Sequence, residues 1–146
     1  MKQTRHSFLK SQGYTSIKLK KTDTNHYQIE AKINDIEGLF ILYTGASNTC
    51  TDLQINKFHL ISTDSEVKAS SATDLMSETK VSKKNKLQIG KWISKSSPIV
   101  LFDMTHINKA LSERDIEVVD GIIGADILKK GKAIIDYEKN KLYLKL

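Results

Sequence analysis

The sequence is poor in the residues that support several common architectures. Its 146 residues include one cysteine and one proline, so an intrachain disulfide is excluded. No run of about 18 apolar residues occurs, so no transmembrane helix is expected. The N-terminus also lacks the apolar stretch of a secretory signal peptide. These absences predict a cytoplasmic protein.

Several kinds of catalytic site are also missing. The four histidines are scattered without ligand spacing, and no cysteine pair accompanies them, so neither a zinc site nor any other metal or cofactor is expected. Ser47 and His59 do not form a recognisable triad, and Gly121–Gly124 lacks the lysine of a phosphate-binding loop. Cys50 has no neighbouring histidine or cationic motif, which favours a packing role over a nucleophilic one.

The composition is that of an ordinary globular domain, with 39% apolar and 27% charged residues. The net charge of +6 is concentrated in Met1–Lys21, which holds six basic residues and no acid, whereas the remainder carries 17 of each sign. We interpret residues 1–15 as a flexible basic arm and residues 16–146 as one domain. The arm could contact an anionic surface or nucleic acid, but no RNA-binding signature accompanies it, so nucleic acid is not expected as a partner.

Alternating apolar residues predict a mostly β domain with one or two short helices. Met1–Gly13 has no clear period. The expected strands begin near Ser16 and include Tyr27–Ile33, Leu39–Tyr43, Lys86–Ile93, Pro98–Phe102, Ala133–Tyr137 and Leu142–Leu146, the last two as a hairpin. The expected helices are Met104–Arg114 and Asp126–Lys130, with Gly131 ending the second. Ser62–Lys86 is polar and predicts a loop or a long hairpin.

Two stretches carry the functional signal. In Gly38–Cys50 an apolar strand runs into the small polar turn Thr44-Gly45-Ala46-Ser47. In Val118–Leu128 an apolar strand is followed by Ile122-Ile123-Gly124 and a short helix. Either motif alone is weak, but their order and the terminal helix and hairpin make the combination specific.

Together these motifs resemble the retropepsin-like aspartic proteases, in which a strand ends in Asp-Thr-Gly-Ala/Ser and a later apolar-apolar-Gly segment folds beside it. The resemblance covers Tyr27–Leu146 and implies a closed β-barrel and peptide-bond hydrolysis. Its mechanism needs two carboxylates about 3 Å apart that share one proton. A chain with a single motif supplies only one loop, so the resemblance implies a homodimer that acts on an extended peptide or protein.

The resemblance also assigns roles to individual residues. Thr44 would join the two loops across the two-fold axis, and Gly45 would allow their close approach. Ala46, Ser47 and Asn48 would line the substrate groove, and Ile122, Ile123 and Gly124 would brace the loop. Ser71, Ala72 and Thr73 would lie in the flap that covers the peptide, although no glycine occurs between Gly45 and Gly90.

Tyr43 stands where the family has its catalytic aspartate. An unperturbed phenol has a pKa near 10 and is a poor base at neutral pH, so we predict an inactive or severely impaired protease. The alternatives are a pseudoprotease that binds peptide without turnover, a protease altered at one position, and a core aromatic outside the motif. An adaptor acting through the basic arm is a further alternative. The candidate substitute acids are Asp52, Asp103, Asp120 and Asp126, of which Asp103 and Asp126 are interpreted as helix caps.

Overall fold

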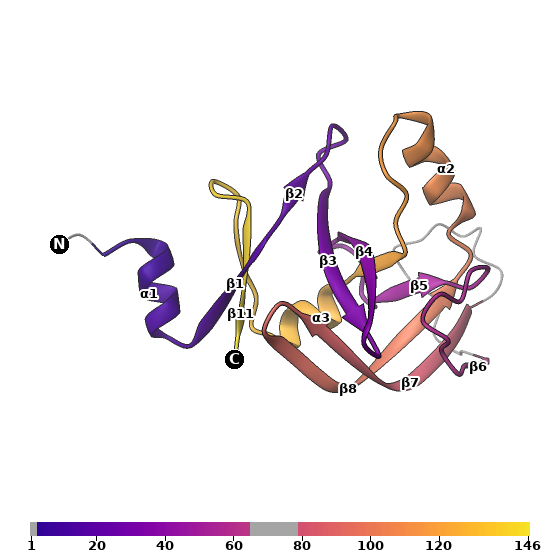
Figure 1. Ribbon diagram of the computed structural model, residues 1–146, viewed down its shortest axis with the longest axis horizontal. Coiled ribbons are helices and arrows are strands. Elements are labelled where there is room, and N and C mark those ends of the chain that lie inside the picture. The colour runs from indigo at the N-terminus through magenta and orange to yellow at the C-terminus, as the bar shows by residue number, and fades with distance from the viewer. Residues whose placement is uncertain (1–2, 65–78) are drawn as a thin grey trace.

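The computed structural model describes residues 3–64 and 79–146 and is dominated by β-strands (Figure 1). Its elements are α1 (Arg5–Ser11), β1 (Tyr14–Lys18), β2 (Lys20–Lys21), β3 (Tyr27–Ile33), β4 (Ile36–Leu42), β5 (Cys50–Asp52), β6 (Thr63–Asp64), β7 (Thr79–Ile89), β8 (Trp92–Phe102), α2 (Thr105–Glu113), β9 (Gly121–Ile123), α3 (Ala125–Lys130), β10 (Ile134–Asp136) and β11 (Lys141–Lys145). The predicted β class with few short helices is confirmed.

Six strands form a closed barrel. They pair in the order β3-β4-β9-β5-β8-β7, and β7 returns to β3 through Lys32↔Gln88 and Ile33↔Leu87. Most neighbours are antiparallel, but β4–β9 and β5–β8 are parallel. Closure leaves few free strand edges, and it places the C-terminal ends of β4 and β9 at the same rim of the barrel.

The interior of the barrel follows from the alternation in the sequence. Ile29, Ala31 and Ile33 of β3 point into the main core cluster, together with Phe40 and Leu42 of β4. A second cluster around Cys50, Val100 and Ile122 lies between the barrel and α2. Burying an aliphatic side chain contributes roughly 1.5–3 kcal/mol, so the pattern that predicted the strands also explains why they pack.

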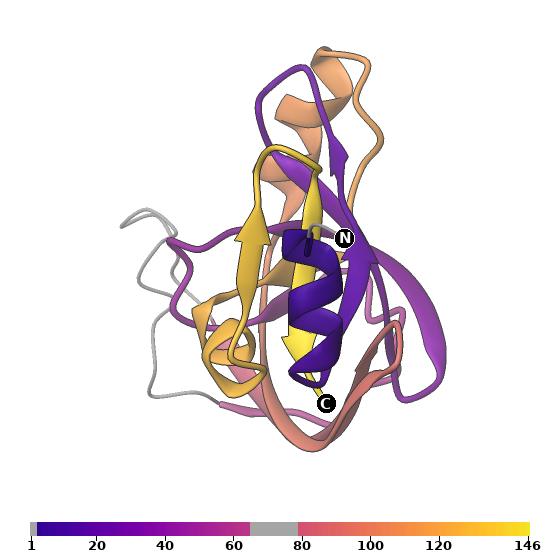
Figure 2. The same cartoon turned by 90° about the vertical axis from the view of Figure 1, so that its left-hand side faces the viewer.

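Both chain ends form a second, three-stranded sheet in the order β1-β11-β10. Leu142 and Leu144 of β11 point towards the barrel core, and Tyr143 points to the opposite face. Figure 2 shows α1 in front of this sheet. Arg5 pairs with Asp136 at 2.7 Å, and His6 Nδ1 lies 3.0 Å from the hydroxyl of Tyr143. The N-terminal helix is thus attached to the C-terminal hairpin.

Part of Met1–Gly13, which has no clear period in the sequence, forms the helix α1. Thr4 caps this helix with a capping box shared with Ser7, a short signal that apolar periodicity does not reveal. The division of the chain into an arm of residues 1–15 and a domain of residues 16–146 stays a prediction, although β1 begins at Tyr14.

The strands of the β7–β8 hairpin are longer than predicted, with 11 residues each. β7 begins at Thr79, within the stretch expected to be a loop or a long hairpin, and Pro98 lies inside β8 instead of starting it. The pairing is shifted beside Pro98, between Ser82↔Ile99 and Asn85↔Ser97. Because proline donates no ladder hydrogen bond, a β-bulge is where a strand can tolerate it.

The C-terminal elements agree with the sequence in type, and α2, α3 and the terminal hairpin lie within two residues of their expected bounds. Leu146 differs, since it is exposed and does not share the core face of Leu142 and Leu144. No helix in residues 3–64 and 79–146 is long and apolar enough to cross a membrane.

The attachment of α1 predicts a loss of stability in acid. Hydrogen bonds from the Lys139 amide and from Arg5 hold the pKa of Asp136 below its usual value. A carboxyl whose folded pKa is lowered stabilises the fold above its unfolded pKa, about 3.9, and this contribution is lost as pH falls through the folded pKa. We expect Asp136→Asn to lower the melting temperature near pH 7 and to reduce its further decline towards about pH 2.

The matched control is Asp115→Asn, at an exposed acid that forms no ion pair within the described residues. The melting temperature of Asp115→Asn should match that of the wild type at each pH from about 7 to about 2. If the melting temperature of Asp136→Asn fell with pH as much as that of the wild type, the linkage between Asp136 and acid stability would be contradicted.

Candidate functional site

The candidate site lies where β4 ends beside β9. The two strands run parallel with Phe40 opposite Gly121 and Leu42 opposite Ile123. The amide of Tyr43 continues this ladder by donating to the carbonyl of Ile123 at 3.0 Å. The two motifs found in the sequence are therefore adjacent, with Tyr43 at the first position beyond the strand.

The loop after β4 is a tight turn closed by its own backbone. The amide of Ala46 donates to the carbonyl of Tyr43 at 3.1 Å, and the amide of Ala125 donates to the carbonyl of Ala46 at 2.6 Å. The first bond makes the turn and the second joins it to the start of α3. The loop is thus positioned by main-chain bonds, which do not depend on the side chain at Tyr43.

Gly124 follows β9 directly and packs closely against the backbone of this loop. A Cβ atom at Gly124 would lie 2.7 Å from the carbonyl oxygen of Asn48 and 2.8 Å from that of Ala46. Both distances are shorter than van der Waals contact, so no larger residue fits without moving the loop. Gly121 is equally confined, since its Cβ would lie 2.2 Å from the carbonyl oxygen of Cys50.

Thr49 joins the same elements through its side chain. Its hydroxyl donates to Asp126 Oδ1 at 2.8 Å and accepts from the Gly124 amide at 3.0 Å. The sequence motifs assign no role to Thr49 and favour Asp126 as a cap of α3. That interpretation of Asp126 is wrong, because the N-cap is Gly124 and Asp126 lies in the first turn. The sequence signal that could have revealed this link was the hydroxyl of Thr49, two residues after Ser47, the last residue of the turn.

The ring of Tyr43 folds back over its own loop. A Cβ atom at Gly45 would lie 2.8 Å from Tyr43 Cε1, 3.0 Å from Cζ and 3.1 Å from the hydroxyl oxygen. The ring therefore lies against the face of Gly45, and 43% of Tyr43 is exposed. This position excludes the interpretation of Tyr43 as an interior aromatic, since it is absent from both core clusters.

The other predicted loop residues differ in exposure. Thr44, Gly45 and Ser47 are exposed and Asn48 is half-buried, whereas Ala46 is 1% exposed and packs in the second core cluster. The side chain of Ala46 thus faces the interior rather than a groove. Ser71, Ala72 and Thr73 lie outside the described residues, between β6 and β7, which pair antiparallel through Thr63↔Val81.

Each aspartate considered as a substitute acid has hydrogen-bond donors of its own. Asp120 Oδ2 accepts from the Leu39 amide and from Lys57, and Asp52 Oδ1 accepts from the amides of Gln54 and Met104. Hydrogen bonds from Thr105, the side chain first, lower the pKa of Asp103. With Asp126 bound to Thr49, all four carboxylates have structural partners.

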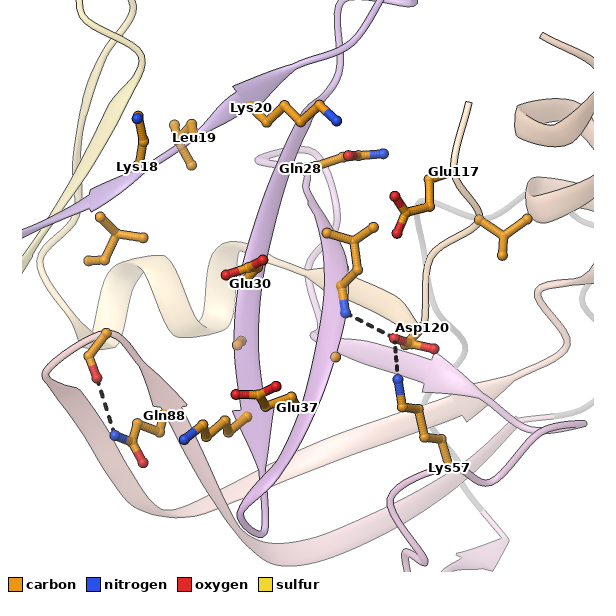
Figure 3. A pocket seen from close by; sticks show the side chains of 17 residues that line it. Lys18, Leu19, Lys20, Gln28, Glu30, Glu37, Lys57, Gln88, Glu117 and Asp120 are labelled. Atoms are coloured by element: carbon orange, nitrogen blue, oxygen red, sulfur yellow. Dashed lines mark hydrogen bonds and ion pairs between the residues drawn. The ribbon is translucent and has the colours of Figure 1, made fainter. Parts of the chain in front are cut away.

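Two pockets flank this region. One, of about 1090 Å³, lies over the outer side of β3 and β4 and is lined by charges of both signs, among them Lys20, Glu30 and Glu37, but by no residue of the Tyr43 loop (Figure 3). The other, of about 330 Å³, is lined by Thr44 together with residues of α3 and β10. No group of three or more His, Cys, Asp or Glu side chains in the described part of the chain could hold a metal ion.

The role of Thr49 can be measured against a second buried threonine. The Thr51 hydroxyl is buried and lacks a hydrogen-bond partner. We expect Thr49→Val to lower the free energy of unfolding by about 1–3 kcal/mol, because it leaves the Gly124 amide without its acceptor. Thr51→Val should be neutral or stabilising in the same denaturant titration. Equal effects of the two substitutions would contradict the role assigned to Thr49.

Cys50 is predicted to be unreactive in the native state. It is 2% exposed, its thiol donates to the Asn48 carbonyl, and burial raises its pKa to about 12. Since the thiolate is the reactive form, a thiol reagent should label the protein only after denaturation. Rapid labelling of the native chain, followed by mass spectrometry, would contradict this packing role.

Comparisons with known proteins complete the description of the site. No protein-family model matches the chain, and no curated protein sequence matches it. Solved structures do. A retropepsin-like aspartic protease from Rickettsia conorii superposes with a TM-score of 0.57 at 19% identity, covering 90% of this chain and 89% of that protein.

Two further structures are similar. The EIAV protease in complex with the inhibitor HBY-793 gives a TM-score of 0.56 at 16% identity, covering 80% of this chain and 98% of that one. The retroviral protease-like domain of Ddi1 from Leishmania major gives 0.51 at 14% identity, covering 80% and 86%. At these identities the likeness concerns the fold, and the expected fold is confirmed: the chain has the closed β-barrel of the retropepsin-like aspartic proteases.

Proposed function

We propose that this chain is a retropepsin-like peptide-binding protein in which Tyr43 has removed aspartic endopeptidase activity. One observation supports the proposal above all. The residue that follows β4, beside the end of β9, carries a phenol ring packed against Gly45 instead of a carboxylate. The mechanism needs a carboxylate that accepts a proton from water, together with a protonated partner that polarises the scissile carbonyl.

The proposed loss of activity extends to the whole assembly. A single closed barrel with one such loop supports a symmetric homodimer, in which each chain brings its own loop to the two-fold axis. Because both loops carry Tyr43, no carboxylate is left at the centre. Asp120 and Asp126 do not offer a replacement, since each already accepts hydrogen bonds that hold β4, β9 and α3 in place.

Peptide binding is supported by what the loop retains. Thr44, Gly45 and Ser47 are exposed at the rim, and the main-chain bonds that shape the turn do not involve the lost carboxylate. An extended peptide could lie over this floor and form strand-like hydrogen bonds. The second candidate is a protease that lost activity by a single change at Tyr43, which the otherwise intact turn favours.

Restoring the acid distinguishes these two functions. We expect the unaltered chain not to cleave a peptide library, and Tyr43→Asp to cleave it with an acidic optimum if the remaining machinery is intact. General acid–base catalysis alone contributes about 10²–10⁴-fold, so the rate should rise at least 100-fold above background. Cleavage is followed by mass spectrometry of the products.

Tyr43→Asn is the matched control, because it removes the ring without supplying a carboxylate. It should remain inactive. Binding of an extended peptide by the unaltered chain, without gain from Tyr43→Asp, supports the binding protein and rejects the recently disabled protease. Cleavage by the unaltered chain at the same site would overturn the proposal.

A further inference from the structure

The net positive charge of the protein comes from its N-terminal and C-terminal segments. Residues 1–24 and 131–146 hold ten basic and three acidic side chains, whereas residues 25–130 hold 13 basic and 14 acidic ones. The fold brings these ends into one sheet through the β1–β11 pairing. The excess charge of the protein therefore lies on the terminal sheet, α1 and β2, and residues 25–130 are close to neutral.

The charge is densest where the β10–β11 turn meets the start of β2. Asn140 anchors this corner: its carbonyl accepts from the Leu19 amide at 2.9 Å, and its side-chain oxygen accepts from the Tyr27 hydroxyl at 2.9 Å. The lysines around this anchor form what we call the lysine corner, which consists of Lys18, Lys20, Lys21, Lys139 and Lys141.

The lysine corner is not neutralised within the described structure. The three ion pairs found there are Arg5–Asp136, Lys57–Asp120 and Lys86–Asp35, and none includes a corner lysine. Lys18 and Lys141 are directly opposite each other in the antiparallel pair, a placement of like charges that destabilises a sheet. Asp23 and Glu138 are the acids nearest along the chain, and Glu30, Glu37 and Glu117 line the same pocket as Lys18 and Lys20 without forming an ion pair with either.

An aromatic pair stands beside these lysines. Tyr137 is 67% exposed, and its ring centroid lies 5.8 Å from that of Tyr27, at an interplanar angle of 45°. Lys21 is opposite Tyr27 in the β2–β3 pairing. The corner thus presents an accessible ring beside five lysines that form no ion pair within the described residues, which is the combination used to stack a base and hold the adjoining phosphates.

We propose that the lysine corner binds single-stranded nucleic acid, with Tyr137 stacking on a base and the lysines contacting phosphates. On sequence alone nucleic acid has little support, because the charges of the arm lack aromatic neighbours. The fold supplies both the hairpin lysines and the tyrosine. An anionic membrane is less favoured, since a membrane-binding surface needs an apolar face next to its charges, and the five residues of the corner are all lysines.

The test measures fluorescence anisotropy of a labelled 15-nucleotide single-stranded oligonucleotide with the full chain, at several salt concentrations. We expect binding that weakens with salt. Lys18→Gln with Lys141→Gln should weaken it at least 10-fold at low salt and reduce the salt slope by about 1.4, since each phosphate that a lysine neutralises adds about 0.7 to the slope. Tyr137→Ala should weaken binding at least 5-fold, whereas Tyr137→Phe retains it.

The matched control is Lys83→Gln with Lys109→Gln, which removes the same charge from an exposed position of β7 and an exposed position of α2. It should leave affinity within about 2-fold, since charge far from a bound phosphate is largely screened. Equal weakening by both double variants would overturn the corner as the site. So would absence of binding at low salt, or binding to anionic vesicles without binding to the oligonucleotide. None of these outcomes tests the role proposed for Tyr43, which the peptide-cleavage assay tests separately.

Discussion

The parallel pairing of β4 with β9 is the constraint on which the rest of the structure depends. It joins segments about 80 residues apart, and it sets the ends of both strands at one rim. Gly121 and Gly124 make this possible, because a side chain at either would collide with the backbone around Cys50 or Asn48. Thr49 then closes the arrangement with one hydroxyl shared between two partners. The loop, the barrel and the start of α3 therefore form one unit.

Much of this could be predicted from the sequence, for physical reasons. Apolar and polar residues alternate strictly over Tyr27–Ile33, and β3 has the bounds predicted from this pattern. The pairing of the Thr44-Gly45 turn with Ile122–Gly124 follows from two motifs that are specific only together. Periodicity, in contrast, could not reveal α1. That helix has one buried residue, Leu9, and its contacts with Asp136 and Tyr143 exist only after the C-terminal hairpin has formed.

The candidate site could be located but not described in detail. The sequence placed Tyr43 at the end of a strand, where the structure has it, yet the ring's position over Gly45 depends on a turn geometry that no spacing encodes. Ala46 was expected in a groove and lies in the core. The sequence revealed only part of the basic surface. The lysines of the terminal hairpin are far from the basic arm along the chain, and they become neighbours of the arm only because β1 pairs with β11.

The shape of the candidate site does not depend on the side chain of Tyr43. The turn is held by the amides of Tyr43, Ala46 and Ala125 and by the Thr49 hydroxyl, and none of these bonds uses the side chain at Tyr43. The phenol at this position therefore leaves the hydrogen bonds of the turn intact, although an unperturbed phenol is a poor proton acceptor at neutral pH. Conversely, the loop does not need catalysis to keep its form. The closed barrel therefore does not decide by itself whether the chain is active, and fold and activity have to be argued separately.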